Sequence, residues 1–504
     1  MKKHYLSKVF EPRSVAIVGA SDRASSVGAQ ALRNMRESGF QGDLYPVNPK
    51  HDQVQGLKAY ASVRDIDHAV DLVVIAVPAG TIPQVMHDCA ESGVGAALVL
   101  SAGFVEVGKA GLTLQRAIVD IARTHGIRLV GPNCLGVMRP RVGLNATFAK
   151  SRVETGRVAL VAQSGAFCTA LLDWADSNGF GFSAVASLGA TADVGFGDVL
   201  DFLAVDAETQ SILLYVEGIA DARSFISGLR VAARLKPVIV VKSGRVCSGR
   251  FDERGAWKSK LTTRTTRFDQ AGKEITGVEK VFDTAIQRAG AVRVLTVNQL
   301  FAAAQTLASD TRVEGPRLAI VTNGGGPGVM AADRASDLGV PMAELADSTI
   351  ERLSAILPAH WSHSDPVDIL GDADSDRYHA ATEIVLADKN VDGVLVLLTP
   401  QAMTNPTACA EAVVSAAGKA HKPVLACWMG EKLVDQGRRL FVEAGIPHFT
   451  SPEGGVDAFG YLACYRRNQA ALLQPLPRYR SNANPTAKAR VWLSNTRPPS
   501  LRIR

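Results

Sequence analysis

The stretch SVAIVGASDRASSVG, residues 14–28, decides the fold of the first part of this chain. Its first five residues form a short apolar run typical of a buried strand, and Gly28–Glu37 repeats apolar residues with the period of a helix. Glycines at a strand-to-helix turn let a phosphate group approach backbone N–H groups at the positive end of the helix dipole. The stretch therefore predicts either a phosphate-binding turn or, as the alternative, a tight turn without a ligand.

The pattern of a strand followed by a helix recurs along most of the 504 residues. Short β-branched runs alternate with Ala- and Leu-rich amphipathic segments, which is typical of βαβ units and buried parallel sheets. The alternation falls into three blocks and predicts an α/β fold with three domains. The predicted strands are Ser14–Val18, Asp43–Val47, Asp71–Val77, Ala96–Leu100, Ile127–Val130, Val158–Ala162, Ser183–Leu188, Ser211–Val216, Val238–Lys242, Leu318–Thr322, Gly393–Leu398 and Pro423–Cys427.

The composition is that of a globular protein, with 47% hydrophobic and 21% charged residues. The longest apolar runs have the length of strands and are too short to span a membrane, and no apolar stretch follows the lysines of the N-terminus. Seven cysteines are scattered without CxxC spacing, which is typical of reduced thiols and not of a disulfide framework or a zinc site. We therefore expect a cytoplasmic protein without a membrane segment.

The formal net charge of +6 is concentrated at the end of the chain. Residues 466–504 contain nine Lys and Arg and no acidic residue, so the other 465 residues carry 46 basic and 49 acidic side chains. The basic segment lacks interleaved aromatic residues and a periodic apolar face, which favours a disordered, solvated tail over 475–504 and disfavours nucleic acid as a partner.

The end of the second predicted strand, YPVNPK (residues 45–50), bears on the kind of nucleotide. A NAD-binding Rossmann domain needs a carboxylate in this region to hold the ribose hydroxyls, but this chain has Lys50 there. A lysine attracts a phosphorylated ribose, such as the 3′-phosphate of coenzyme A or the 2′-phosphate of NADP. The alternative is that Lys50 is a solvated loop residue.

Three more loops follow successive strands of the first block: VPAG (77–80), SAGF (101–104) and GPNCLG (131–136). Open parallel sheets bind their ligands beyond the carboxyl ends of the strands, so these loops together predict one binding edge, although each alone could be a simple turn. The residues predicted to contact the ligand are Gly19, Ser21, Ser25, Val27, Val47, Asn48, Lys50, Val77, Pro78, Ser101, Ala102, Gly103 and Asn133.

In this order, GAS…VG, YPVNPK, VPAG, SAGF and GPNCLG resemble the CoA-binding domain of nucleoside-diphosphate-forming acyl-CoA synthetases, the relatives of the succinyl-CoA synthetase α-subunit. The resemblance covers about Lys8 to Gln474 and continues through AQSGA (162–166), LYVEG (214–218), KSGR (242–245), NGGGPG (323–328) and DPVD (365–368). AIQRAG (285–290) and YRRNQ (465–469) look closest to the synthetase-like region of bacterial Pat-type protein lysine acetyltransferases, which join it to an ATP-grasp region and a GNAT domain.

The resemblance implies the domains and the ligand. It implies a Rossmann-like CoA-binding domain over 8–150, a succinyl-CoA-ligase-like flavodoxin domain over 151–307, and a second ligase-like flavodoxin domain over 315–474. The ligand would be coenzyme A or acyl-CoA. We also expect a homo-oligomer, with an ATP-grasp subunit or an acetyltransferase as a further partner.

The resemblance also implies a mechanism. Acyl-CoA and phosphate would give an acyl phosphate, a histidine would take the phosphoryl group, and an ATP-grasp domain would pass it to ADP. Glu217 would orient the imidazole. The residues of two phosphate loops at helix N-termini would be Gln163, Ser164, Gly165, Asn323, Gly324, Gly325 and Gly326.

The sequence departs from this pattern where the histidine should lie. None of the ten histidines falls between His125 and His360, and residues 246–274, where it is expected, show neither strand nor helix period. Glu217 therefore has no imidazole to orient, and a structural or solvated role is favoured. We predict that 246–274 is an exposed loop or disordered, and local drift or a frame error in the gene is one hypothesis for it and for the tail. His360 and His363 lack a third ligand of suitable spacing, so we predict no metal site.

These observations favour a CoA- or acyl-CoA-binding protein without phosphohistidine turnover. Three alternatives stay open. The chain could be an active α-type subunit that works with a separate ATP-grasp chain, since no ATP-grasp or GNAT pattern is found in these residues. It could be an acyl-CoA-sensing regulatory remnant of a Pat-type acetyltransferase, or an NADP oxidoreductase, for which no proton donor can be named.

Overall fold

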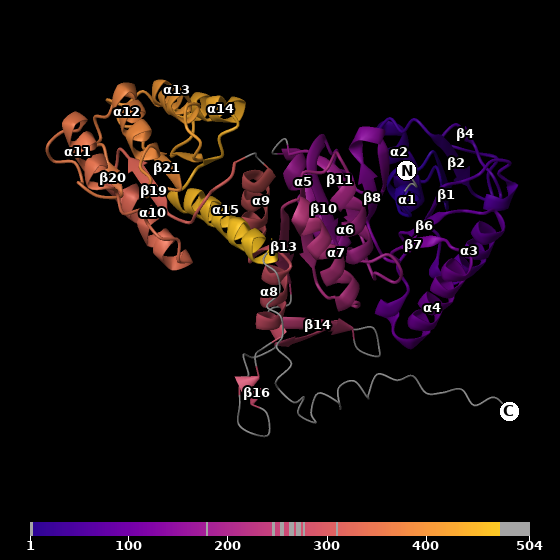
Figure 1. The fold of residues 1–504 in the computed structure, drawn as a ribbon. Helices are drawn as coiled ribbons and strands as arrows, with labels where there is room; N and C mark the ends of the chain where they lie inside the picture. Colours follow the sequence, from indigo (N-terminus) through magenta and orange to yellow (C-terminus); the bar gives the residue numbers. More distant parts are fainter. Residues whose placement is uncertain are drawn as a thin grey trace. The chain divides into compact units, whose positions relative to one another are not determined.

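The computed structural model describes residues 4–177, 180–243, 278–308 and 311–473, together with short strands between 247 and 275 (Figure 1). The chain separates into two units, Met1–Leu472 and Leu473–Arg504, and the architecture below is that of the first unit. The predicted basic tail, 475–504, lies outside the described residues. The predicted α/β class with a Rossmann-like sheet and two flavodoxin-like sheets is confirmed.

The first sheet has five parallel strands in the order β2-β1-β5-β6-β7. β2 lies on one side of β1 and all later strands lie on the other, which makes the carboxyl end of β1 a switch point where open sheets bind ligands. The strands are β1 (Ser14–Val18), β2 (Asp43–Val47), β5 (Leu72–Ile75), β6 (Ala96–Val99) and β7 (Arg128–Val130); the helices are α1 (Ser7–Phe10), α2 (Val27–Glu37), α3 (Ile82–Glu91) and α4 (Lys109–Thr124).

The second sheet has seven strands in the order β18-β13-β12-β10-β11-β8-β9. Five of them are parallel and repeat the winding of the first sheet, with β10 at the switch point. The strands are β8 (Gly136–Arg139), β9 (Leu144–Thr147), β10 (Thr155–Ala162), β11 (Phe182–Ser187), β12 (Ser211–Val216), β13 (Val238–Lys242) and β18 (Val292–Val294); the helices are α5 (Gly165–Ser177), α6 (Phe196–Val205), α7 (Ala222–Leu235), α8 (Val278–Arg288) and α9 (Val297–Ala308).

The β8–β9 hairpin ties the first two sheets into one body. These residues lie within the predicted first domain, 8–150, and β8 pairs antiparallel with β11 of the second sheet, with Val185 opposite Met138. On the other side, Asn34 of α2 is buried and its side-chain amide donates to the carbonyls of Thr147 and Ala149, both at 2.8 Å. The hairpin is therefore part of the second sheet and is also held by a helix of the first.

The third sheet has five parallel strands in the order β20-β19-β21-β22-β23, with β19 at the switch point. Its strands are β19 (Leu318–Thr322), β20 (Val367–Asp368), β21 (Gly393–Leu398), β22 (Val424–Trp428) and β23 (His448–Phe449); the helices are α10 (Gly325–Leu338), α11 (Asp347–Ile356), α12 (Ser375–Leu386), α13 (Pro406–Ala417), α14 (Asp435–Glu443) and α15 (Pro452–Leu473).

Helix α15 joins the second and third sheets. Val456 and Phe459 near its start belong to one buried cluster that also contains Leu160 of β10 and Leu395 of β21. Near its end, the buried amide of Asn468 donates to the carbonyl of Ala291 at 2.8 Å. The second and third sheets therefore share a hydrophobic core, which burial of their apolar side chains stabilises.

The irregular stretch 246–274 contains described backbone in four short strands. β14 (Cys247–Phe251) pairs antiparallel with β15 (Trp257–Leu261), and β16 (Arg267–Phe268) pairs with β17 (Glu274–Ile275). The prediction of a loop or disorder is wrong for these strands, because hairpin pairing needs no amphipathic period over such short segments. The other residues of the stretch lie outside the described part of the chain.

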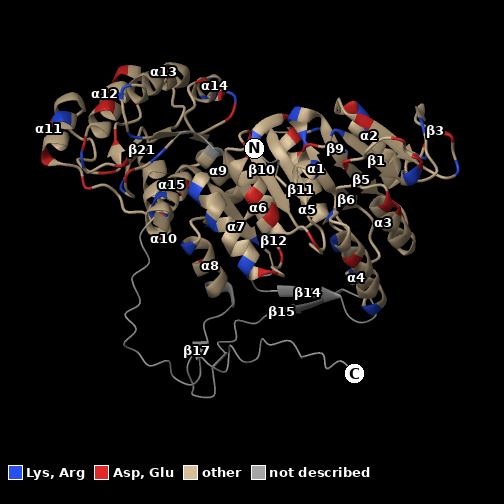
Figure 2. Cartoon of the chain, turned by 45° about the vertical axis from the view of Figure 1, so that its right-hand side comes forward, with Lys and Arg blue, Asp and Glu red and all other residues tan. Residues whose placement is uncertain are grey.

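Basic and acidic residues are interspersed along the helices (Figure 2). This agrees with the near balance of basic and acidic residues outside the C-terminal segment. Among the described residues, every helix is either too short or too polar to cross a lipid bilayer.

Candidate functional site

The turn between β1 and α2 is built on two glycines with close backbone neighbours. Gly19 has a φ of +91°, a conformation that only glycine adopts readily, and a Cβ there would lie 2.6 Å from the carbonyl oxygen of Ala76 after β5. At the start of α2, a Cβ on Gly28 would lie 2.0 Å from the carbonyl oxygen of Gly19. The two glycines therefore bring the loop, the helix N-terminus and the end of β5 within backbone contact.

Asn48 fastens the end of β2 to this turn. Its side-chain amide donates to the carbonyl of Ala20 at 2.8 Å, and its Oδ1 accepts the backbone N–H of Lys50 at 2.9 Å. Lys50 is exposed. The predicted cation thus lies on a loop that is hydrogen-bonded to the phosphate-type turn.

The loops after β5, β6 and β7 are linked in the same way. The hydroxyl of Ser101 donates to the carbonyl of Val77 at 2.6 Å, and the backbone N–H of Asn133 donates to the carbonyl of Ser101 at 3.0 Å. We name the loops after β1, β2, β5, β6 and β7 the ligand edge. Of the predicted contact residues of the first sheet, Val47 ends β2 and Val27 begins α2, where each adjoins the ligand edge. The others lie within it: Gly19, Ser21, Ser25, Asn48, Lys50, Val77, Pro78, Ser101, Ala102, Gly103 and Asn133.

The loop between β11 and α6, residues 188–195, connects the ligand edge with the second sheet. Its Ala190 N–H donates to the carbonyl of Pro132 at 2.9 Å, and its Gly189 N–H donates to the carbonyl of Gln163 at 3.2 Å. The same loop therefore touches the ligand edge and the first predicted phosphate loop. Sequence reasoning missed it, because the loop has no motif and its partners are far away in the chain.

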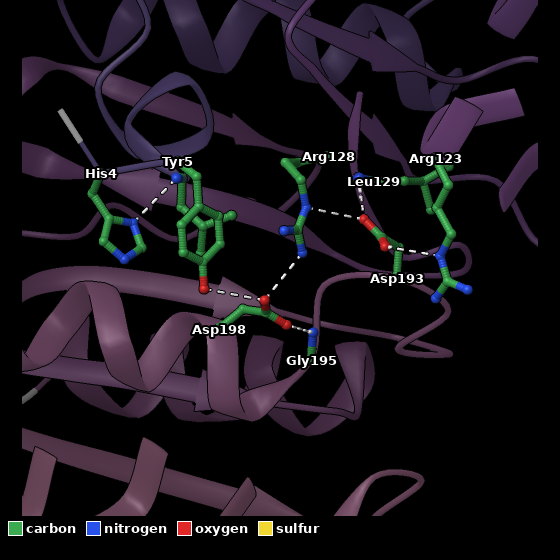
Figure 3. A network of polar contacts seen from close by, with 9 residues as sticks. His4, Tyr5, Arg123, Arg128, Leu129, Asp193, Gly195 and Asp198 are labelled. Atoms are coloured by element: carbon green, nitrogen blue, oxygen red, sulfur yellow. Dashed lines mark hydrogen bonds and ion pairs between the residues drawn. The ribbon is translucent and has the colours of Figure 1, made fainter. Parts of the chain in front are cut away.

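A polar network carries this connection across the first and second sheets (Figure 3). Arg128 of β7 contacts Asp193 at 3.2 Å and Asp198 of α6 at 3.1 Å, and Asp193 also accepts the N–H of Leu129 at 3.1 Å. The hydroxyl of Tyr5 donates to Asp198 at 3.1 Å. Burial, and then the negative charge of Asp198, raises the pKa of Tyr5, so the phenol stays a hydrogen-bond donor.

The first predicted phosphate loop, Gln163–Gly165, lies at the carboxyl end of β10 and opens α5. The side-chain oxygen of Gln163 accepts the N–H groups of Glu217 and Gly218 at 2.6 and 2.9 Å. Ser164 caps the helix, since its hydroxyl accepts the N–H of Phe167 at 3.2 Å. Burial of the Glu217 carboxyl raises its pKa, although a hydrogen bond with Tyr215 lowers it in part.

The second predicted phosphate loop, Asn323–Gly326, lies in the third sheet at the start of α10, so the two predicted loops belong to different sheets. Asn323 is buried and serves the fold: its Oδ1 accepts the N–H of Thr399 at 2.8 Å and its Nδ2 donates to the Thr399 carbonyl at 2.9 Å. A Cβ on Gly325 would lie 3.2 Å from Oδ2 of Asp368, so a carboxylate lies beside this helix N-terminus.

Asp365, which begins the same DPVD loop, is expected to make stability depend on pH. Its Oδ1 accepts the N–H of Ile320 at 2.8 Å, while its Oδ2 has no hydrogen-bond partner among the described residues. Burial raises the pKa of Asp365 to about 7. Between the ordinary carboxyl pKa and this value, the unfolded chain releases a proton that the folded chain keeps, so the stability contribution falls as pH rises.

We therefore expect the unfolding temperature of the wild type to fall relative to that of Asp365→Asn as pH rises from about 4 to about 7. Thermal unfolding followed by circular dichroism across this range measures the difference. Asp347→Asn, in the exposed first turn of α11, is the matched control and should follow the wild type. A constant difference between Asp365→Asn and the wild type would contradict the assignment.

Comparison with known proteins identifies the three sheets. Residues 13–140 match the CoA binding domain, 155–307 the succinyl-CoA ligase like flavodoxin domain, and 318–475 the ligase-CoA domain. An acetate–CoA ligase (ADP-forming) II α-subunit from Pyrococcus furiosus is 35% identical over 454 residues, which are 89% of this chain and 95% of that protein. The chain belongs to the ADP-forming acetate–CoA ligase family. The ligand class of its first domain is therefore CoA or acyl-CoA.

Relatives in this family differ in length. Acetate–CoA ligase (ADP-forming) I from Archaeoglobus fulgidus is 39% identical over 465 residues; these are 92% of this chain but 64% of that protein. The solved structure of the dinucleotide forming acetyl-coenzyme A synthetase 1 of Ca. Korarchaeum cryptofilum, in complex with phosphate and ADP, covers 94% of this chain and 99% of that chain with a TM-score of 0.81 and 32% identity. The family fold thus extends over all three sheets.

The described residues contain no group of three or more His, Cys, Asp and Glu side chains that could hold a metal ion. His360 and His363, the weak candidates from the sequence, are exposed, and a ring nitrogen of His363 lies 3.1 Å from the carbonyl oxygen of Ala359. That contact gives His363 a local partner in its own loop.

Proposed function

We propose that this chain binds CoA or an acyl-CoA at the ligand edge, and that it does so without phosphohistidine turnover. The observation that carries the proposal is the ligand edge. Hydrogen bonds join its loops after β1 and β2 and, separately, its loops after β5, β6 and β7. The loop after β2 carries the exposed Lys50 where a NAD site would need a carboxylate. Domain limits of 8–150, 151–307 and 315–474 are part of this proposal. Titration calorimetry with CoA, acetyl-CoA and NADH tests it, and a preference for NADH would overturn it.

Lys50→Glu is expected to weaken CoA binding about tenfold, because a carboxylate repels the 3′-phosphate that Lys50 attracts. Binding of dephospho-CoA, which lacks this phosphate, should change by less than about twofold. Arg116→Glu, an equal charge reversal on the exposed side of α4, is the control for the overall charge of the domain. Equal losses for CoA and dephospho-CoA, measured by calorimetry, would refute this role of Lys50.

Absence of phosphohistidine turnover rests on the sequence between His125 and His360, which has no histidine. A second candidate function is an active α-type subunit with a separate ATP-grasp chain. It is favoured by the α-subunits of Pyrococcus furiosus, of which this chain covers 95% and 97%. Incubation with radiolabelled ATP and an ATP-grasp partner chain separates the two: acid-labile label on this chain supports the subunit, and its absence supports binding alone.

A more specific alternative is a regulatory role derived from a Pat-type acetyltransferase. It rests on the sequence resemblance at residues 285–290 and 465–469. In the structure, two residues of the second stretch have packing roles. Asn468 bonds to Ala291, and the amide of Gln469 donates to the carbonyl of Ala233 at 2.7 Å. Pull-down of an acetyltransferase, together with a change of its activity when this chain and acetyl-CoA are added, would support the regulatory role. Without such a partner, the resemblance at 465–469 reflects packing alone.

The remaining parts of the proposal concern the cellular location and the oligomeric state of the protein. The described side chains include six free cysteines, five of them buried, which supports a reducing cytoplasmic location. A homo-oligomer is also part of the proposal, and light scattering of the purified chain tests it.

A further inference from the structure

A two-strand hairpin beside the ligand edge contains an unusual residue. β3 (Gln53–Val54) pairs with β4 (Leu57–Lys58), and Gln55 occupies the turn with a φ of +50°. Few non-glycine residues adopt this left-handed conformation, and they persist where the surroundings hold them in place. The surroundings of Gln55 are the β1–α2 loop of the ligand edge.

The side chain of Gln55 spans this loop. Its Nε2 donates to the carbonyl of Ser21 at 3.2 Å, near the start of the loop, and to the carbonyl of Ala29 at 2.9 Å, in the first turn of α2. One amide group therefore links the two ends of the segment that the sequence predicts to receive the phosphates. A shorter side chain cannot reach both carbonyls from the same backbone position.

The backbone of Gln55 is held as well. Its N–H donates to Oδ1 of Asp22 at 2.7 Å, and its carbonyl accepts from Arg36 of α2 at 2.8 Å. Asp22 is the one acidic residue among residues 19–26. Its carboxylate would repel a bound phosphate, and the hydrogen bond from Gln55 gives that carboxylate a partner of its own in the hairpin.

We propose that Gln55 is a positioning residue for CoA: it touches no ligand, but it holds the β1–α2 loop in the conformation that receives the phosphate groups. This inference rests on the proposed CoA-binding function. It assigns the β3–β4 hairpin to the binding site as a support, and it explains why a residue with a polar side chain occupies a left-handed position there.

Two variants of Gln55 test the inference in the full chain. Gln55→Met keeps the length of the side chain and removes the amide donor, so CoA affinity should fall about tenfold. Gln55→Glu places a carboxylate against the carbonyls of Ser21 and Ala29 and should lose more. Gln53→Glu adds the same charge to an exposed position in β3 and should change the affinity by less than about threefold.

Calorimetry with CoA is run at low salt and at about 0.5 M NaCl, where exposed charges are screened. A loss caused by positioning persists at high salt, whereas a loss caused by charge alone disappears. Hydrogen exchange gives an independent readout: amides of residues 20–26 should exchange faster in Gln55→Met and regain protection with saturating CoA.

The outcomes separate the two proposals. If the wild type itself does not bind CoA, the proposed function fails. If the wild type binds CoA and both Gln55 variants bind it equally well, with unchanged exchange of residues 20–26, the proposed function stands and the role of Gln55 is refuted. If a variant does not fold and so shows no thermal transition, hydrogen exchange of the wild type with and without CoA still tests the inference. The β1–α2 loop and the turn of the β3–β4 hairpin should gain protection together when CoA binds. Protection of the loop without protection of the turn would overturn the inference.

Discussion

Gly28→Ala is expected to lower CoA affinity about tenfold to a hundredfold, and to lower the stability of the first domain as well. A Cβ at this position would lie 2.0 Å from the carbonyl oxygen of Gly19 and 2.6 Å from its carbonyl carbon. Both atoms belong to the backbone, so no side chain can rotate away, and α2 or the loop must move. Overpacking of this kind costs about 1–3 kcal/mol, and about 1.4 kcal/mol corresponds to a factor of ten in affinity.

Gly80→Ala is the matched control for this substitution. Gly80 also lies in a loop of the ligand edge, but a Cβ there would have no neighbour within 4 Å, and its φ lies outside the left-handed region. We expect its CoA affinity and unfolding temperature to stay close to those of the wild type. Calorimetry with CoA and thermal unfolding measure both quantities, and equal effects of the two substitutions would show that the contact with Gly19 does not matter.

Arg139→Met is expected to lower the free energy of unfolding by about 3–5 kcal/mol, the range found when one partner of a buried ion pair is removed. Arg139 of β8 is 2% exposed and forms two hydrogen bonds with Asp206, at 2.6 and 2.8 Å. Asp206 follows α6, so the pair fastens the hairpin to that helix. Without Arg139, the Asp206 carboxylate would be left largely buried and without its main cation.

The double variant Arg139→Met, Asp206→Leu is the control. It removes both charges, and replacing a buried ion pair by apolar side chains often restores stability, so more than half of the loss should be recovered. Urea unfolding measures the three free energies. No recovery in the double variant would mean that the loss comes from packing of the Arg139 side chain against Phe202, whose ring centre lies 5.7 Å from its guanidinium carbon.

The effect of Arg139→Met should also depend on pH. Burial opposes ionisation of Asp206, but hydrogen bonds from Arg139 and Thr209 outweigh it, so the pKa of Asp206 lies below its ordinary value. A carboxyl group with a lowered pKa stabilises the fold above the pKa of the unfolded chain, and this contribution is lost as pH falls through the folded pKa. The difference between the wild type and Arg139→Met should therefore shrink at acidic pH.

Local patterns predicted the parallel strands well. The predicted bounds of Ser14–Val18, Asp43–Val47 and Ser211–Val216 are those of β1, β2 and β12. β1 and β12 are buried along nearly their whole length, so their apolar runs are continuous and visible in a short window. β2 lies at the edge of its sheet, and its last three residues are buried. The loops of the ligand edge follow directly from the strand ends of the first sheet, which is why its predicted contact residues lie in these loops or adjoin them.

Contacts between residues that are far apart in the sequence could not be predicted. The β8–β9 hairpin follows the GPNCLG loop, and its place in the second sheet depends on pairing with β11, which no local pattern encodes. Gln55 is a single polar residue in a turn, and its role depends on carbonyls 34 and 26 residues away. In the third sheet, NGGGPG does mark a helix start, but the buried side chain of Asn323 bonds to Thr399 and so is committed to the fold.

The loop 188–195 affects how the first domain would behave if it were isolated from the rest of the chain. β7 is an edge strand, and its unpaired carbonyls would offer a template for other chains. Val194 donates to the carbonyl of Leu129 at 3.0 Å and Ala192 to that of Gly131 at 3.1 Å, so the second domain covers this edge. If the first domain were expressed without residues 188–195, β7 would be an exposed edge strand. We expect such a fragment to self-associate through β7, which the second domain prevents in the full chain.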